Sequence, residues 1–195
     1  ACMAMGIDYP AVTDHNTIQG ALAVKEIAPF PIIIGEEVRS LEGEILGLFL
    51  KEEVPAQLSP LDTVARIKDQ GGLVGIPHPF DRFRSPLKMS FLEKIMEDID
   101  FIEVFNSRVM LKGDNNKAQL FAKEHDLLMT AASDSHSPWE IGKSWVEVPE
   151  FYDPDSFCRS LKEGHIGGSV SSPLIHLVSR WSVLRRKLGW RPISD

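Results

Sequence analysis

Short apolar runs alternate with helical patterns along most of the chain. The runs with β-type composition cover residues 8–13, 31–38, 44–50, 73–76, 101–105, 127–132 and 145–148. The helical patterns cover residues 59–70, 91–96, 114–123 and 154–163. Strands that alternate with helices of this length are typical of βαβ units, in which successive strands run parallel. The pattern therefore predicts an α/β fold with a mostly parallel sheet, and no linker-like stretch divides it.

Composition narrows the class of protein further. The 195 residues are 43% hydrophobic and 25% charged, as in a globular domain, and no apolar run is long enough to span a bilayer. The two cysteines, Cys2 and Cys158, cannot build a disulfide framework or a thiolate metal site, so the expected compartment is a reducing cytoplasm. A net charge of −7 argues against general coating of nucleic acids.

The first six residues have the pattern of a helix end, where Gly6 supplies the left-handed stop. A helix that ends there normally begins earlier. Because the sequence also does not begin with Met, we expect further chain before Ala1.

Side chains that can bind metals follow five of the predicted strands. They are Asp14 and His15, Glu36 and Glu37, His78, Glu103 and Asn106, and Asp134 and His136. Because the carboxyl ends of parallel strands open on one face of an α/β fold, these side chains are predicted to converge on one rim. Imidazole with carboxylate suits zinc, manganese or iron, and the lack of cysteine favours an open, hydrolytic site.

Taken singly, these residues also have structural interpretations. His78 lies between two prolines and could belong to a rigid turn, and Asp134 could form an Asx turn beside His136. Glu36 is interpreted as an exposed strand end. His125, His165 and His176 are predicted to be structural or solvated. A metal site is favoured because the candidate residues all follow predicted strands and so fall on one rim.

Four motifs, taken in order, make the chain resemble the PHP family, named for polymerase and histidinol phosphatase. They are Ala-Val-Thr-Asp-His-Asn-Thr at 11–17, Ile-Ile-Gly-Glu-Glu at 33–37, Ile-Pro-His-Pro at 76–79 and Ala-Ser-Asp-Ser-His at 132–136. The resemblance implies a distorted (β/α)7 TIM-like barrel over residues 1–172, with up to three metal ions at the strand ends. The family's first strand, which carries His-x-His, has no counterpart here. The barrel is therefore expected to lack that strand, and the chain to bind fewer ions than the full cluster.

The resemblance also assigns roles to particular residues. It implies that His15 and His136 bind one ion, and that Glu37 bridges two others, with Asp134 on one of these and His78 on the other. The further candidate ligands are Asp14, Glu44 and Glu103. Glu44 aligns with a place where many family members carry a ligand histidine.

These assignments predict metal-dependent hydrolysis of a phosphate ester, by a phosphomonoesterase or by a phosphodiesterase acting on nucleotides or oligonucleotide ends. Two or three ions (Zn, Mn or Fe) in an intact centre would activate a water as the nucleophile, so no separate catalytic side chain is assigned. The substrate-binding candidates are Arg82, Arg84, Asn106 and Arg108. A guanidinium fork suits phosphate, although a solvated loop paired with Asp81 would also explain the arginines. The expected partner is a small phosphorylated substrate or an oligonucleotide end, without stable nucleic-acid binding and without a membrane.

The alternative from another class is a non-catalytic PHP-like module that binds a partner or nucleic acid. Its support is the excess of basic residues in the segment 173–195, which would suit a phosphate backbone or a membrane surface. The apolar residues of the segment fall at helical spacing, however, and the preferred interpretation is an amphipathic helix packed on the barrel with its charged face solvated. Metal content discriminates between the two hypotheses, since bound ions support an enzyme and an empty site supports a module.

Overall fold

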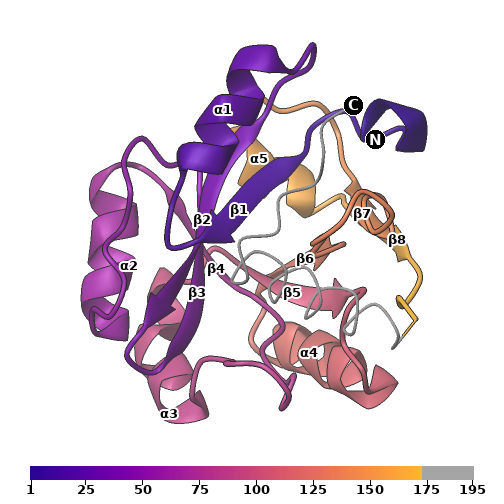
Figure 1. Ribbon diagram of the computed structural model, residues 1–195. Coiled ribbons are helices and arrows are strands. Elements are labelled where there is room, and N and C mark those ends of the chain that lie inside the picture. The colour runs from indigo at the N-terminus through magenta and orange to yellow at the C-terminus, as the bar shows by residue number, and fades with distance from the viewer. Residues whose placement is uncertain (173–195) are drawn as a thin grey trace, which may run out of the picture.

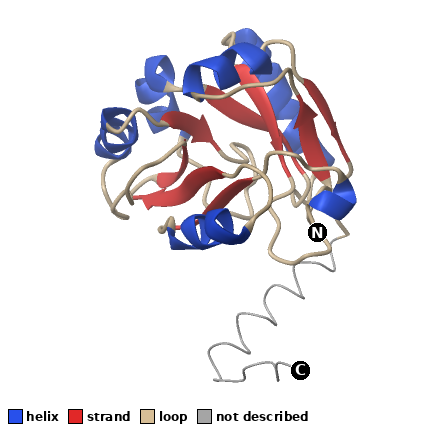
Figure 2. Cartoon of the chain, turned by 90° about the horizontal axis from the view of Figure 1, so that it is seen from above, coloured by secondary structure: helices blue, strands red, loops and turns tan. Residues whose placement is uncertain are grey.

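Six strands form one curled sheet, and most of the helices cover its outside (Figures 1 and 2). The structure, a computed structural model, describes residues 1–172. The sheet has the order β1 (Ala11–His15), β2 (Ile33–Ser40), β3 (Gly43–Leu48), β4 (Leu73–Ile76), β5 (Phe101–Asn106) and β6 (Leu128–Ala132). The fold is mixed α/β, as the alternating pattern predicted, and its sheet is a half-barrel. The helix predicted over 173–195 lies outside the described residues.

The remaining elements flank this sheet. They are the 3₁₀ helices η1 (Met3–Met5) and η2 (Glu93–Asp98), the helices α1 (Gln19–Ile27), α2 (Pro60–Asp69), α3 (Met89–Leu92), α4 (Lys112–Glu124) and α5 (Pro154–Leu161), and a two-stranded antiparallel sheet of β7 (Ser144–Glu147) and β8 (His165–Gly168). Ser59 caps α2 as predicted, accepting from the Asp62 N–H. Helix α1 was not predicted, because Ile18 at its N-cap makes no side-chain capping bond. Within residues 1–172, no helix is both long and apolar enough to cross a membrane.

The sheet is mostly parallel, as the pattern predicted, and β3 is the strand that departs from this arrangement. The pairs β1–β2, β4–β5 and β5–β6 are parallel, but β3 runs antiparallel to both β2 and β4. Only Leu41 and Glu42 connect β2 to β3, which is enough for a hairpin and far too short for a parallel crossover. As a result, the first residues of β3 lie at the same edge of the sheet as the carboxyl ends of the other strands.

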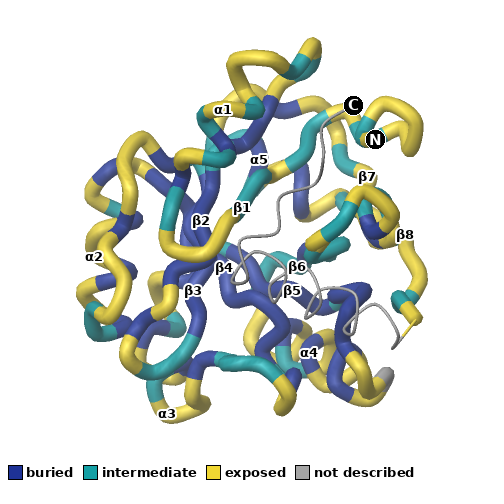
Figure 3. The backbone as a smooth tube through the Cα atoms, in the orientation of Figure 1, coloured by how far each residue is buried: buried dark blue, intermediate teal, exposed yellow. Residues whose placement is uncertain are grey.

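Two apolar cores lie on opposite faces of the curled sheet. The convex face packs under the helices through Val38, Ile45, Val74, Ile76 and Ile102, with Ile67, Ala118 and Ala122 from α2 and α4. The concave face is filled at one end by Ile33, Leu48, Leu73 and Phe101 together with Phe151, Phe157 and Leu161. Figure 3 shows the buried strands between the partly exposed helices. The inner core occupies the end of the half-barrel opposite to the carboxyl ends of the parallel strands, which leaves that edge free for polar side chains.

Glu36 is buried, which corrects its interpretation as an exposed strand end. Its side chain alternates with that of Glu37 along β2 and so lies on the convex side, with no exposed surface. Glu36 Oε2 accepts from the Val54 N–H at 2.9 Å, whereas Oε1 has no hydrogen-bond partner among the described residues. Burial raises the pKa of this carboxyl above its usual value, against the lowering effect of the Val54 bond.

We predict that Glu36→Gln gains stability relative to the wild type as pH rises. Because the folded-state pKa of Glu36 is raised, the wild type loses stability between the pKa of the unfolded chain and that of the folded protein, and glutamine has no such loss. Urea unfolding of both proteins at pH 5, 7 and 9 measures the difference. It should grow by at most about 1.4 kcal/mol per pH unit, until Glu36 is ionised in both states.

Glu26→Gln, on the exposed face of α1, is the control for this comparison. A difference between Glu36→Gln and the wild type that does not change with pH would contradict the prediction.

Candidate metal centre

His15, Glu37 and Glu44 come from three adjacent strands and face one another at the open edge of the sheet. His15 ends β1 and is the register partner of Glu37 on β2, so that its Nδ1 lies 3.9 Å from Glu37 Oε1. Glu44 lies near the start of β3, and the antiparallel direction of that strand brings it to this edge. One ligand atom from each of the three side chains lies within 4.8 Å of the others. The three residues therefore offer one nitrogen and two carboxylate donors to a single cation.

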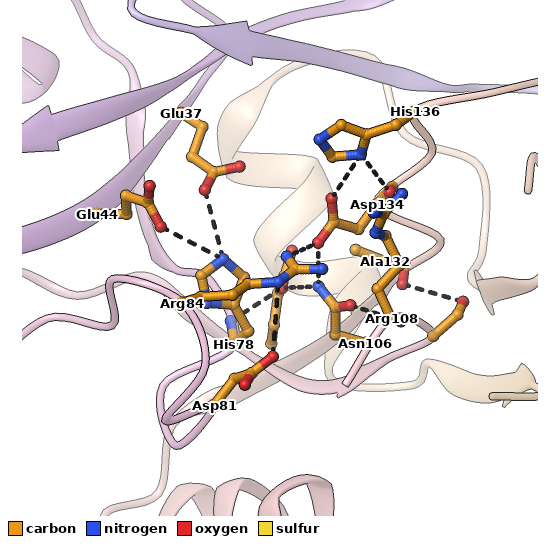
Figure 4. Close-up of polar contacts among 12 residues, drawn as sticks. Glu37, Glu44, His78, Asp81, Arg84, Asn106, Arg108, Ala132, Asp134 and His136 are labelled. Carbon is orange, nitrogen blue, oxygen red and sulfur yellow. Dashed lines mark hydrogen bonds and ion pairs between the residues drawn. The ribbon is translucent and has the colours of Figure 1, made fainter. Parts of the chain in front are cut away.

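His78 completes this group from the loop after β4. Its Nε2 lies 3.4 Å from Glu37 Oε1 and 3.7 Å from Glu44 Oε2 (Figure 4). The imidazole is 1% exposed, and its Nδ1 has no hydrogen-bond partner among the described residues. The backbone of His78 has φ +28°, a strained value, and its N–H donates to Glu103 Oε2 at 3.0 Å. Glu103 thus fixes the peptide that aims the ring.

Asp134 and His136 reach the same space from the loop after β6. His136 Nδ1 lies 3.4 Å from Asp134 Oδ1, and the rings of His15 and His136 are 6.1 Å apart between centroids. Asp134 has φ +50° and accepts from Asn106 Nδ2 at 3.0 Å. Its Oδ2 also accepts from Arg84 Nη1 (Figure 4). The carboxylate is therefore held by two donors and lies beside a third nitrogen.

A β-bulge in β5 lets Glu103 and Asn106 point to the same side. The register with β6 shifts between Glu103 and Phe105. Side chains three positions apart in a regular strand point to opposite faces, and the extra residue of a bulge reverses this. Asn106 Nδ2 consequently donates to Glu103 Oε2 at 3.1 Å as well as to Asp134. One amide connects the His78 loop to the Asp134 loop.

The buried charges shift one another's pKa. Burial raises the pKa of Glu103 to about 7, while neighbouring His78 opposes and Asp134 reinforces the shift. Burial and the charge of Glu37 raise the pKa of Glu44. Burial disfavours the charged forms of Glu37 and His78 too, but their mutual hydrogen bond and the attraction of opposite charges together outweigh it. The pKa of Glu37 therefore lies below and that of His78 above the usual value.

A cavity of about 410 Å³ opens beside these side chains. Its charged lining consists of His15, Glu37, Arg39, Glu44, Arg84, Arg108 and His136. A larger space of about 1740 Å³, between the outer strands β1 and β6, reaches His15, Glu37, His78, Glu103, Asp134 and His136 from the other side. Imidazole and carboxylate groups thus share one cavity with three arginines.

The structure brings most, but not all, of the residues predicted from the sequence to the candidate metal centre. It brings together His15, Glu37, Glu44, His78, Glu103, Asn106, Asp134, His136 and Arg84. It does not bring Asp14 to them, because this side chain alternates with His15 and lies against Gly20 of α1, where a Cβ would be 1.9 Å from Asp14 Oδ2. Arg82 is mostly exposed and pairs with Asp114 of α4 at 3.7 Å, outside the cavity lining. The role of each residue as a ligand or a substrate contact stays a prediction.

Sequence reasoning missed Arg39 and Glu140. Arg39 lies two residues after Glu37 on β2, on the same face, and an i, i+2 pattern could have found it. Glu140 has no such signal. It is fully buried, and it accepts from Arg108 Nη1 at 2.6 Å, from the His136 N–H at 3.0 Å and from Ser137 Oγ at 2.9 Å. The predicted substrate arginine, Arg108, therefore also helps to hold the loop that carries His136.

Comparison with known proteins is consistent with this geometry. The family model described as PHP-associated matches residues 112–166. An uncharacterized protein of Methanocaldococcus jannaschii is 37% identical over 164 residues, which are 78% of this chain and 66% of that protein, so the chain spans about two thirds of its relative.

Two solved structures share the fold at low sequence identity. A two-domain protein of Bacteroides vulgatus, which contains a predicted PHP-like metal-dependent phosphoesterase, has a TM-score of 0.65 at 17% identity, over 84% of this chain and 57% of that chain. A lesion-specific endonuclease of Pyrococcus furiosus has a TM-score of 0.55 at 15% identity, over 83% and 50%. At these identities the likeness concerns the fold alone.

The curled sheet with a His and carboxylate cluster at its open edge defines the class, an α/β half-barrel with a candidate metal centre. The family-model match over residues 112–166 and the shared fold support the PHP domain family as the family of this chain.

We predict that Glu140→Ala lowers the free energy of unfolding by about 3 kcal/mol, because it removes a buried carboxylate that serves three donors, one of them a guanidinium. Ser137→Ala removes one of these bonds alone and should cost about 1 kcal/mol. Chemical denaturation of the two variants beside the wild type makes the comparison. Equal losses for the two variants would show that the Arg108–Glu140 pair does not hold the loop.

We also predict that cation binding releases protons and strengthens as pH rises. His78 and Glu44 have raised pKa values, and each must lose its proton before it can bind a cation. Calorimetric titration with Mn²⁺ at pH 6.5, in two buffers of different ionisation enthalpy, should give different heats. Identical heats in the two buffers would contradict proton release.

Proposed function

We propose that the protein containing this chain hydrolyses phosphate esters with divalent metal ions, as a phosphomonoesterase or as a phosphodiesterase acting on nucleotides or oligonucleotide ends. The observation that carries the proposal is the juxtaposition in one cavity of an imidazole and carboxylate cluster with arginines. The first is the donor set of hydrolytic metal centres, and the second suits the oxygens of a phosphoryl group.

The residues present fit a divalent cation. His15, Glu37 and Glu44 offer converging donors, and His78 adds a buried imidazole whose Nε2 faces both carboxylates. Two or three ions in the intact centre, with Zn, Mn or Fe as the candidates, belong to this proposal. A cation held there would acidify a water and offset negative charge on the phosphoryl oxygens.

The chain's own side chains would position the substrate. Arg84 and Arg39 line the cavity beside the carboxylates, so a phosphate group held between them would be oriented by bidentate hydrogen bonds. Asn106 and Glu103 fix the loops that carry Asp134 and His78, and they hold these donors before any ligand arrives. Preorganisation of this kind reduces the rearrangement that the reaction requires.

The distorted (β/α)7 barrel is part of the same proposal. Its support is that the outer strands β1 and β6 flank the space of about 1740 Å³, which a further strand carrying the family's His-x-His would fill. Such a strand would add two imidazoles to the donor set.

The test is turnover of phosphomonoesters, nucleotides and short oligonucleotides by the protein with Mn²⁺, Zn²⁺ or Fe²⁺. We expect chelators to abolish the activity, and His78→Ala to lower kcat by about a hundredfold or more, because it removes a donor that faces Glu37 and Glu44. His165→Ala is the matched control, since His165 is exposed on β8 and lines neither cavity. No turnover with any of these metals, or equal rates for the two variants, would favour the non-catalytic module.

A further inference from the structure

Arg84 lies where a cation would otherwise neutralise Asp134. Its Nη1 donates to Asp134 Oδ2, and its Nε lies 3.5 Å from Asp81 Oδ2. Figure 4 shows the guanidinium between His78 and the Asp134 loop. The arginine side chain is 18% exposed, and the two carboxylates are almost completely buried. The charge of Asp134 is therefore balanced by the chain itself.

The group of His15, Glu37 and Glu44 differs in this respect. The guanidinium next to it, that of Arg39, is half-exposed and lies 3.9 Å from Glu44 Oε1. The donors of this group converge within 4.8 Å, whereas Asp134 Oδ2 is already engaged by both Arg84 and Asn106. The group of His15, Glu37 and Glu44 can therefore accept a cation as it stands, whereas Asp134 is occupied by an arginine.

The loop that carries Arg84 fixes its backbone by hydrogen bonds, whereas the end of its side chain is held by the contacts with Asp81 and Asp134 given above. The Arg84 N–H donates to the Asp81 carbonyl at 3.2 Å, and the Phe83 N–H donates to Asp81 Oδ1 at 3.0 Å. Asp81 is itself buried, and its N–H donates to the His78 carbonyl. A rotation of the arginine side chain alone would leave these bonds intact, and the guanidinium would remain in the cavity that Arg84 already lines.

We infer that Arg84 is a placeholder for the cation at Asp134. An ion that binds Asp134 displaces the guanidinium, because two positive charges at one carboxylate repel each other, and the released guanidinium then binds the phosphate group in the cavity. Cation loading and phosphate binding are in this way coupled through one side chain. The inference rests on the proposed function, since it assumes the same metal centre.

Titration calorimetry with Zn²⁺ alone tests the displacement. The wild type should bind in two steps, and Asp134→Asn should lose the weaker one, which assigns that step to Asp134. Arg84→Gln should tighten the weaker step by about tenfold, because a charge-assisted bond no longer competes, and should leave the stronger step unchanged. Arg84→Lys keeps the positive charge and should restore most of the competition. Arg66→Gln is the matched control, since Arg66 is exposed on α2 and lines neither cavity.

Inorganic phosphate tests the second half of the inference. Titrated into the protein loaded with Zn²⁺, it should bind about tenfold more weakly to Arg84→Gln than to the wild type or to Arg66→Gln. A weaker cation step that Arg84→Gln leaves unchanged or weakens would overturn the inference, and so would unaltered phosphate binding.

The wild-type protein gives a measurement that does not depend on the folding of a variant. The ¹⁵Nε resonance of Arg84 should shift when the weaker Zn²⁺ step fills, and a resonance that stays in place would overturn the inference. The outcomes also separate this inference from the proposed function. Cation binding that depends on Arg84 without turnover of any ester would remove the proposed function alone, and turnover with cation binding insensitive to Arg84 would remove the inference alone.

Discussion

Four acidic side chains occupy one small, poorly solvated space, and their mutual repulsion is the constraint on which this structure depends. Glu37, Glu44, Glu103 and Asp134 are all nearly buried. Like charges at short range in a medium of low dielectric strongly favour protonation or a bound cation. Three groups offset the repulsion by contacting the carboxylates: the guanidinium of Arg84, the imidazole of His78 and the side-chain amide of Asn106.

Strand direction and a bulge together bring these groups to one edge of the sheet. Parallel strands alone would deliver donors from their carboxyl ends, but Glu44 arrives from the start of a strand that runs the other way. The bulge in β5 likewise turns Glu103 and Asn106 to a common side. The inner apolar core lies at the opposite end of the half-barrel, so burial of Phe101 and its neighbours supports the edge without competing for space there. At Gly75 a Cβ would meet the Phe101 ring at 2.2 Å, so that packing needs glycine.

The sequence predicted the α/β class and the convergence on one edge because both depend on local patterns. Apolar runs of four to eight residues set the strands, and His or acidic residues directly after them signalled the edge. It could not predict that Glu37 lies within β2 instead of at its end, since strand length there depends on pairing with β3. The roles of Glu140 and Arg82 depend on contacts across 32 residues in each case, which no local pattern encodes. Asp14 was misplaced because a strand directs neighbouring side chains to opposite faces.

The positive φ angles of His78 and Asp134 restrict which types of side chain suit these two positions of the centre. Among residues with a side chain, Asn, Asp and His adopt positive φ most readily, and β-branched residues do so least. The backbone at these two positions therefore favours Asn, Asp, His and glycine over β-branched residues. Donors of these types select hard and borderline cations, and thiolates, which select soft ones, gain no such advantage from the backbone. The backbone conformation at two residues thus influences which metal ions this fold can bind.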